Sequence, residues 1–245
     1  MSVMFLAVII GILTSQAESQ GLYRLELVRA APGHLLELID VYKQRFPVIR
    51  AAGETPPIII RHSQGDQWDL MLIYPMGESF SGYFSHEQLA RREAAAQESG
   101  MDTGEYADRL SQLTAWREDV IVSGPSLDSV ADRFAEFSYY HVEMMVALPG
   151  KYHELVRERE MENEYSASIG RPENLIFTRV LGAAWEVITI GLYRNLQHFA
   201  EPSEMTQDER DAAARNAGFE AVNRIGTYLR TLISYHHDTL AGAVR

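Results

Sequence analysis

The sequence is 245 residues long, carries a formal net charge of −12 at pH 7, and is 46% hydrophobic. This composition is that of a globular protein, and a strong negative charge without clustered lysine and arginine argues against nucleic-acid binding. The absence of cysteine excludes disulfides, thiolate metal ligands and a cysteine nucleophile. It is also compatible with an oxidising compartment.

An apolar segment, residues 3–13, lies near the start of the chain. It is too short to cross a bilayer, which needs about 20 residues. The small residues Ser15 and Ala17 follow it at the two positions that a signal peptidase reads. No lysine or arginine precedes the segment, so a frayed N-terminus is the alternative. We expect residues 1–21 to be a signal peptide, the protein to be exported to the periplasm or secreted, and no transmembrane segment to be present.

The rest of the sequence repeats itself at an offset of 117 positions, beginning with Tyr23 and Tyr140. The identities continue without a gap as far as Ile73 and are far more numerous than in unrelated sequences of this composition. The identical positions, in first-half numbering, are Tyr23, Glu26, Ala30, Pro32, Gly33, Glu37, Leu38, Gly53, Ile59, Gly65, Trp68 and Ile73. The repeat predicts two units, residues 22–124 and 125–245, each long enough to bury a core.

The first half shows five predicted elements. Alternating apolar and polar residues at 23–27 predict a strand, and the Pro-Gly pair that follows predicts a helix over residues 33–46. Apolar residues at 58–61 and 68–74 predict two more strands, the second of which is apolar on both faces and therefore covered on both sides. Apolar residues at helical spacing predict a second helix over residues 106–122.

The second half follows the same order. Strands are predicted at residues 140–144, 175–178 and 185–190, and helices at residues 151–166 and 219–240. Strand, helix, strand, strand and helix is a ferredoxin-like order, in which the helices cover one face of an antiparallel sheet. The other face of each sheet would be bare. We therefore predict an α+β fold in which two tandem ferredoxin-like units pack sheet to sheet as an intramolecular α+β barrel, with a cavity between the sheets.

The strand, Pro-Gly and helix pattern at residues 23–38 and 140–155, together with the strand-to-helix junction at residues 185–199, resembles the dimeric α+β barrel superfamily. Within it the pattern is similar to NIPSNAP-like and antibiotic-biosynthesis-monooxygenase-like proteins. The resemblance covers residues 22–122 and 138–240 as a tandem fusion. Members of this superfamily include cofactor-independent monooxygenases, polyketide cyclases and haem-handling enzymes, so the resemblance does not select an activity.

The side chains with chemical potential lie on the first strand of each half. We expect the apolar positions of these strands to face the helices, and Arg24, Glu26, His141 and Glu143 to face the space between the sheets. A carboxylate in a cavity gains proton affinity and histidine titrates near neutrality. Glu26, His141 and Glu143 are therefore acid–base candidates, and Arg24 and Arg61 are candidates for orienting a charged substrate. The alternative is that these groups are solvated or form structural ion pairs.

Other matched positions are interpreted as structural. Trp68 and Trp185 are predicted to be core residues, and Asp69 and Glu186 to be buried acids or edge charges. No cofactor motif is present.

A metal site is not predicted, because His141 and Glu143 supply only two ligands. If the protein binds haem, His236 and His237 on the last predicted helix are the candidate axial ligands. We expect the protein to bind or convert a small organic molecule between the sheets without a metal or nucleotide cofactor. The alternatives are a non-catalytic binding or interaction protein with a filled barrel, and a haem-binding barrel. The substrate and the oligomeric state stay open.

Overall fold

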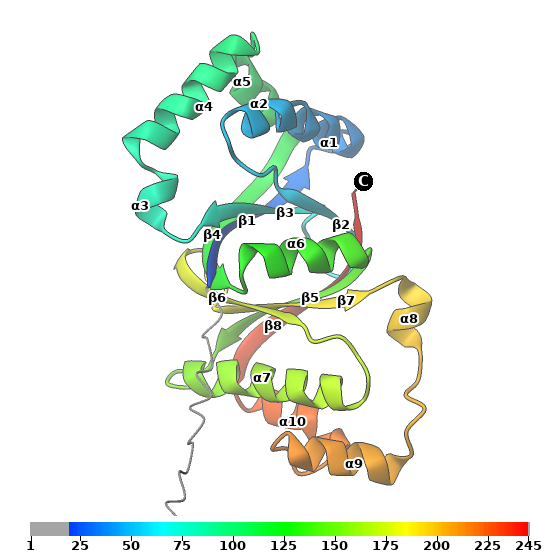
Figure 1. The fold of residues 1–245 in the computed structure, drawn as a ribbon. Helices are drawn as coiled ribbons and strands as arrows, with labels where there is room; N and C mark the ends of the chain where they lie inside the picture. The colour runs from blue at the N-terminus through cyan, green and yellow to red at the C-terminus, as the bar shows by residue number, and fades with distance from the viewer. Residues whose placement is uncertain (1–19, 245) are drawn as a thin grey trace, which may run out of the picture.

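The computed structural model describes residues 20–244, so the expected signal peptide lies almost wholly outside the described residues. The described chain has an α+β fold, in which eight antiparallel strands close into a barrel and helices lie around its outside (Figure 1). Within this part of the chain, every helix is too short or too polar to cross a membrane.

The barrel halves contain the same succession of strands, with helices between them. The first half comprises β1 (Gly21–Ala30), α1 (Leu35–Gln44), α2 (Phe46–Ala51), β2 (Ile58–Gln64), β3 (Leu70–Gly77), α3 (Phe80–Tyr83), α4 (His86–Glu98), α5 (Thr103–Leu113) and β4 (Thr114–Gly124). The second half comprises α6 (Leu127–Glu136), β5 (Tyr139–Ala147), α7 (Tyr152–Ser168), β6 (Leu175–Gly182), β7 (Val187–Tyr193), α8 (Leu196–Ala200), α9 (Gln207–Asn216), the short 3-10 turn η1 (Val222–Arg224), α10 (Ile225–Arg230) and β8 (Ile233–Ala243).

The last element of each half corrects the sequence prediction. Helices were predicted over residues 106–122 and 219–240, but the helical chain ends at Leu113 and at Arg230 and continues as the strands β4 and β8. The prediction is wrong because β4 pairs with β1, and β8 with β5, along nearly their whole lengths. The β-branched residues 120–122 favour this pairing. The fourth strand completes the ferredoxin-like order in both halves.

The barrel closes edge to edge. The strand order is β4-β1-β3-β2 in the first half and β8-β5-β7-β6 in the second, and the halves join through antiparallel β2–β8 and β4–β6 pairs. The two halves therefore share one continuous sheet that closes into a barrel, as the predicted α+β barrel requires, but they join edge to edge and not by stacking one sheet on the other.

Matched glycines lie at the two joins between the halves. Gly65 and Gly182 have φ values of +126° and +113°, a conformation that favours glycine. A Cβ atom would lie 2.2 Å from the carbonyl oxygen of Asp238 at the first position and 2.6 Å from that of Asp119 at the second. Only glycine therefore lets the chain pass this close to the neighbouring strand.

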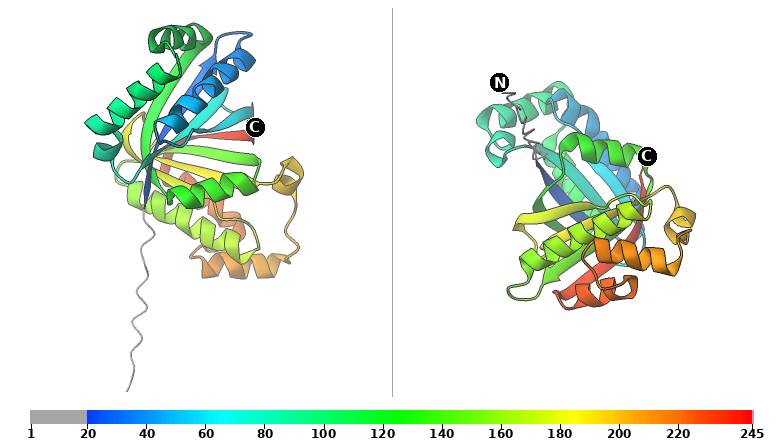
Figure 2. Two further views of the ribbon diagram at one scale, coloured as in Figure 1. Left: turned by 45° about the horizontal axis from the view of Figure 1, so that its top comes forward. Right: turned by 60° about the horizontal axis from the view of Figure 1, so that its bottom comes forward.

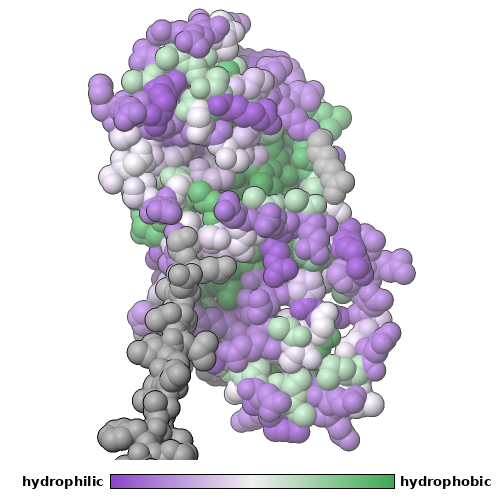
Figure 3. All heavy atoms as spheres, viewed as in Figure 1, coloured by the Kyte–Doolittle hydropathy of each residue, from purple (hydrophilic) through white to green (hydrophobic). Residues whose placement is uncertain are grey.

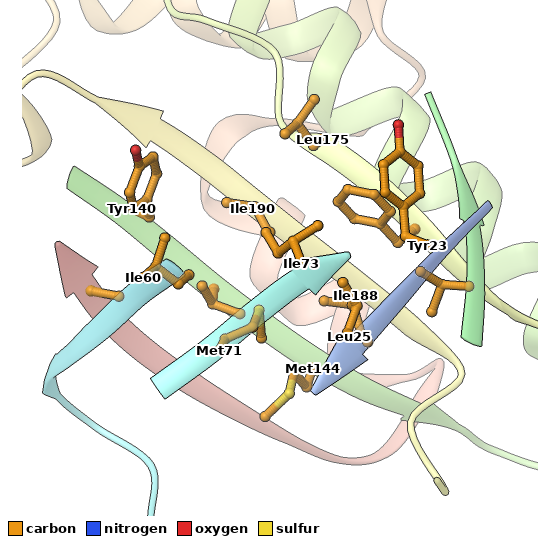
Figure 4. Packing of buried hydrophobic residues seen from close by; sticks show 14 of the residues in the cluster. Tyr23, Leu25, Ile60, Met71, Ile73, Tyr140, Met144, Leu175, Ile188 and Ile190 are labelled. Carbon is orange, nitrogen blue, oxygen red and sulfur yellow. The ribbon is translucent and has the colours of Figure 1, made fainter. Parts of the chain in front are cut away.

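The interior of the barrel is filled with apolar side chains, as Figure 4 shows. Trp68 is 1% exposed and belongs to this core, as predicted. The core also includes the apolar positions of the first strands, namely Tyr23, Leu25, Leu27, Tyr140, Val142 and Met144. The predicted orientation is therefore wrong, because these side chains point inward and the polar positions between them point toward the helices. The predicted cavity between the sheets is occupied by this core.

A second apolar layer lies between the barrel and the helices on each side. It contains Val28 and Leu72 under α1 in the first half, and Met145 and Val187 under α7 in the second. Because both faces of the sheet are buried, β3 and β7 are apolar on both faces. Figure 2 shows α1, α2, α4 and α5 on one side of the barrel and α7, α9 and α10 on the other.

The matched acids Asp69 and Glu186 have structural roles. Each carboxylate accepts a hydrogen bond of 2.8 Å from a backbone N–H, that of Ala30 for Asp69 and that of Ala147 for Glu186. The two carboxylates provide hydrogen-bond acceptors for the last backbone N–H groups of β1 and β5, where each strand leaves the sheet.

Candidate functional site

Two polar clusters lie on the outer face of the barrel, each covered by the helices of its own half. The first cluster consists of Arg24, Glu26, Tyr42, Tyr74, Arg117 and Asp119. The second cluster consists of His141, Glu143, Glu158, Arg159, Glu162, His236 and Asp238. Their central strands, β1 and β5, are four strands apart in either direction around the closed barrel, so the clusters lie on opposite sides. The three acid–base candidates therefore do not form one site: His141 and Glu143 lie together, and Glu26 lies in the other half.

Glu26 is the centre of the first cluster and is only 2% exposed. The hydroxyl of Tyr42 on α1 donates a hydrogen bond of 2.8 Å to Oε1 of Glu26. Nη2 of Arg24 donates to Oε2 at 3.1 Å, and Nη1 of Arg117 lies 3.7 Å from Oε1. The Arg24 guanidinium also lies 4.1 Å from the centre of the Tyr74 ring. The buried carboxylate is therefore compensated by two cations and a phenol.

The phenols around Glu26 are held in their neutral form. Burial raises the pKa of Tyr42, and the negative charge of Glu26 raises it further. The pKa of Tyr74 is well above its usual value for the same two reasons, and burial raises that of Tyr106 on α5. These hydroxyl groups are therefore hydrogen-bond donors at neutral pH.

Arg61 lies apart from this cluster. It is an exposed residue of β2, at the join with β8, and its Cα atom pairs with Gly242. Within residues 20–244, no hydrogen bond or salt bridge joins Arg61 to Arg24 or Glu26. The two arginines that are candidates for orienting a charged substrate therefore lie on different strands, with β3 between them.

A cavity of about 930 Å³ lies beside the first cluster, between α1, α2, α4, α5 and the start of β4. Tyr42 and Arg117, which contact Glu26, belong to its wall, together with Arg45, Tyr106 and Trp116. The volume is that of a typical small-molecule site, within about 300–1,000 Å³. The sequence analysis did not find this cavity, because α4 lies in a region for which it predicted no element. In the space-filling view, hydrophobic side chains reach the surface in the recess between the upper helices and the barrel (Figure 3).

The cationic side chains of this cavity differ in how they are paired. Arg92 donates two hydrogen bonds, of 2.9 and 2.6 Å, to the carboxylate of Glu54. Arg45, at the junction of α1 and α2, has its guanidinium 5.3 Å from the centre of the Tyr106 ring. Within residues 20–244, no salt bridge joins Arg45 to a carboxylate. Arg45 is therefore the cation of the cavity wall that is available to an anionic ligand.

The second cluster is centred on Glu143. Nη1 of Arg159 on α7 donates to Oε2 of Glu143 at 3.1 Å, and Thr189 on β7 donates to the same oxygen at 3.0 Å. Arg159 also contacts the carboxylates of Glu158 and Glu162. Burial raises the pKa of Glu162 to about 7: the charge of Arg159 opposes this, and the negative charges of Glu143 and Glu158 add to it.

His141 completes the second cluster with two residues of β8. Its Nε2 atom lies 3.6 Å from Oδ1 of Asp238, and Nε2 of His236 lies 3.1 Å from Oδ2 of the same carboxylate. Burial lowers the pKa of His141, but the contacts with Asp238 and Glu143 outweigh it, so that the pKa is raised. The contact with His141 lowers the pKa of Asp238.

The sequence analysis missed the roles of His236 and Asp238 because it placed them on a helix. In the structure Asp238 lies directly opposite Glu143 in the β5–β8 pair, as Asp119 lies opposite Glu26 in the β1–β4 pair. The match of Asp119 with Asp238 in the repeat was the available signal. The haem alternative relied on a helix for His236 and His237, and that basis is wrong because both residues are on β8.

Comparisons with known families and with curated proteins give no match. Among solved structures, one described as an anthrone oxidase-like protein aligns with a TM-score of 0.53 and 10% identity over 94% of this chain and 93% of that chain. Two proteins provisionally described as monooxygenases, from Fusobacterium nucleatum and Lactobacillus acidophilus, align with TM-scores of 0.48 and 0.46. Their identities are 7% and 11%, over 94% and 93% of this chain and 94% and 99% of theirs. At such identities the likeness shows the fold alone, an α+β barrel.

Proposed function

We propose that this protein binds a small, planar organic anion in the cavity of the first half. The observation that carries the proposal is the cavity of about 930 Å³ with Arg45 in its wall and the aromatic side chains of Tyr106 and Trp116 beside it. Arginine recognises a carboxylate or phenolate through paired hydrogen bonds. Aromatic walls favour a flat, apolar ligand body, through offset or edge-to-face contacts.

Tyr42 extends the proposal from binding to proton transfer. Tyr42 belongs to the cavity wall, and its hydroxyl donates a hydrogen bond to the buried carboxylate of Glu26. A ligand hydroxyl at this point of the wall would donate a hydrogen bond to the Tyr42 oxygen while Tyr42 donates to Glu26, so that a proton could pass from the ligand through the phenol to the carboxylate. The acid–base role of Glu26 remains part of the proposal, and it takes place in this cavity and not inside the barrel.

The fold likeness suggests which ligands to test first. An anthrone is a tricyclic aromatic ketone whose enol form is a phenol, so its size and acidity fit a cavity with aromatic walls and one available cation. The likeness to the anthrone oxidase-like protein extends to the fold only. Hydroxylated tricyclic ketones and their carboxylic acids are therefore the first panel.

Tryptophan fluorescence tests the proposal directly, because Trp116 lies in the cavity wall. We expect the panel to contain a ligand that quenches the wild-type protein, and Trp116→Phe to remove the quench. Arg45→Gln should weaken binding about tenfold, which corresponds to about 1.4 kcal/mol. Arg50→Gln on the same helical segment is the matched control, since Arg50 is outside the cavity wall. Equal affinities for wild type and Arg45→Gln would contradict the proposal.

We also propose export and a tandem duplication. The apolar segment at residues 3–13 and the small residues Ser15 and Ala17 support export. N-terminal sequencing of protein from the culture medium or periplasm should find a mature start within residues 18–22, and a start at Met1 would contradict export.

The sequence repeat and the identical strand orders of the two halves support the proposed tandem duplication. We also propose that the chain is related to NIPSNAP-like proteins.

A further inference from the structure

The second cluster brings together three metal-ligand side chains on the side of the barrel opposite the cavity. One nitrogen of His141, one oxygen of Glu143 and one oxygen of Asp238 all lie within 4.8 Å of one another. His141 and Glu143 are two residues apart on the same face of β5, and Asp238 lies opposite Glu143 on β8. We propose that these three residues bind a divalent transition-metal cation, with Zn²⁺ and Mn²⁺ as the leading cases.

The carboxylates of Glu143 and Asp238 each have one oxygen in contact with neighbouring side chains, which leaves the other oxygen available to a metal ion. The hydrogen bonds from Arg159 and Thr189 both end on Oε2 of Glu143, which leaves Oε1 as the ligand atom. Oδ2 of Asp238 contacts His236, and Oδ1 lies on the side of His141. Metal ligands are commonly held by such outer contacts, which fix their orientation before the ion arrives.

The charges of the second cluster also favour a cation. Three carboxylates, those of Glu143, Glu158 and Glu162, contact the single guanidinium of Arg159, and the carboxylate of Asp238 lies opposite Glu143 on β8. The Glu158 side chain is 0% exposed, and its Oε1 atom has no hydrogen-bond partner. Buried carboxylates are stable only when cations or hydrogen bonds compensate them, and one arginine does not compensate the charge of three. A divalent ion supplies the missing positive charge.

The first cluster is an internal comparison for this argument. It has the same pair of opposed carboxylates, but Arg24 and Arg117 stand where the second half has His141 and His236. Guanidinium groups remain charged and cannot ligate a metal, whereas a neutral imidazole can. The same acidic pair is therefore neutralised by side chains in the first half and is left to an ion in the second.

The donor set indicates the class of metal. One imidazole nitrogen with two carboxylate oxygens suits borderline and harder transition cations, and lacks the soft ligands of copper(I) sites. Three protein ligands leave at least one coordination position for water or a ligand oxygen. Asp238 is 49% exposed at its side chain, so solvent reaches the site.

Isothermal titration of the tag-free, EDTA-treated chain with Zn²⁺ or Mn²⁺ tests the proposal. We expect wild type to bind one ion per chain. His141→Arg/His236→Arg, which reproduces the pattern of the first cluster, should bind at least about tenfold more weakly. The ion should raise the unfolding temperature of wild type and not that of the variant. His86→Arg, at an exposed position of α4, is the control and should retain wild-type affinity.

Two results would overturn the proposal: no saturable binding by wild type, or equal affinities for wild type and His141→Arg/His236→Arg. If the double variant does not fold, Asp238→Asn replaces it, because this substitution keeps the side-chain volume and removes the anionic ligand. It should bind the metal more weakly than wild type, and an equal affinity would overturn the proposal. Arg45→Gln, which tests the cavity of the first half, should leave metal affinity unchanged. The two proposals can therefore fail independently.

Discussion

Glu26 and Glu143 occupy equivalent positions of the repeat, yet different groups compensate them. A phenol, that of Tyr42, donates to Glu26, and at the equivalent position of α7 a guanidinium, that of Arg159, donates to Glu143. A phenol donates a hydrogen bond without adding positive charge, so the positive charge beside Glu26 comes from Arg24 and Arg117. At Glu143, by contrast, the donor itself, Arg159, is a cation. Single side-chain differences at matched positions therefore give the two halves different electrostatics.

The same contrast continues one helical turn further along. Arg45 in the first half is equivalent to Glu162 in the second. The first half therefore presents a cation beside its cavity, and the second half presents a further carboxylate beside its buried acids. This reversal of charge is the residue-level reason for assigning an organic anion to one half and a metal cation to the other.

Removing a compensating group should destabilise the fold in proportion to the charge left behind. Tyr42→Phe removes one hydrogen bond from a buried carboxylate and should cost about 1–3 kcal/mol of the free energy of unfolding. Arg159→Met leaves several carboxylates without their cation and should cost about 3–5 kcal/mol. Urea unfolding measures both, with Tyr228→Phe at an exposed position as the control. A larger loss for Tyr42→Phe than for Arg159→Met would contradict this order.

Stability should fall at alkaline pH because of the buried phenols. The pKa values of Tyr42, Tyr74 and Tyr106 are raised by folding, so these groups keep their protons when the unfolded chain loses them. Above about pH 10 the unfolded state binds fewer protons, and the free energy of unfolding decreases as pH rises. Urea unfolding between about pH 8 and pH 11 should show the decrease, and Tyr42→Phe should make it shallower. A pH-independent free energy over this range would contradict it.

At the scale of the elements, the joins between the halves depend on the fourth strands. β4 pairs with β6, and β8 with β2, so each half contributes its last strand to the closure of the barrel. Gly65 and Gly182 permit these close approaches, because any side chain there would meet the backbone of the neighbouring strand. Their match in the repeat follows from the equivalence of the two joins.

Alanine at these joins should therefore be costly. Gly65→Ala and Gly182→Ala combine positive φ with a contact between Cβ and backbone, and each should lose about 2–4 kcal/mol of stability. Gly33→Ala is the matched control, because Gly33 has a φ of +84° but nothing within 4 Å of the added Cβ atom. It should lose about 1 kcal/mol. Thermal unfolding compares the three, and equal losses would show that the close approach is unimportant.

At the scale of the whole molecule, the closed barrel leaves no free sheet edge. β2 and β4, the edge strands of the first half, are both paired with strands of the second. The apolar inner face of each half is covered by the other half (Figure 4). Closure therefore satisfies the backbone groups of the edges and buries the common core at the same time.

Residues 20–124 expressed alone should consequently self-associate. The fragment exposes two unpaired edges and the inner apolar face, and a second copy can cover both in the way the second half does. Light scattering after size-exclusion chromatography should show a dimer or larger species, whereas the intact chain has its edges paired internally. A folded, monomeric fragment would contradict the prediction.

The sequence alone predicted the α+β class, two halves of like order, and the polar residues on β1 and β5. It also predicted three of the four strands in each half, because those strands have clear local patterns at 23–27, 58–61 and 68–74 and at the matched positions. The fourth strands were missed because their pairing with distant strands outweighs the helical spacing of their apolar residues. Glu26, His141 and Glu143 lie at polar positions of β1 and β5, and their acid–base role stays a prediction.

The alternation of apolar and polar residues along a strand establishes that the strand has two different faces. The sequence by itself determined this feature of the barrel. Which face turns inward depends on what covers each side, and only the tertiary structure decided that the apolar positions fill the barrel while Glu26 and Glu143 lie under helices. The tertiary structure also placed Asp238 opposite Glu143 and enclosed the cavity beside Arg45. These arrangements join segments far apart in the chain, so no local pattern of residues encodes them.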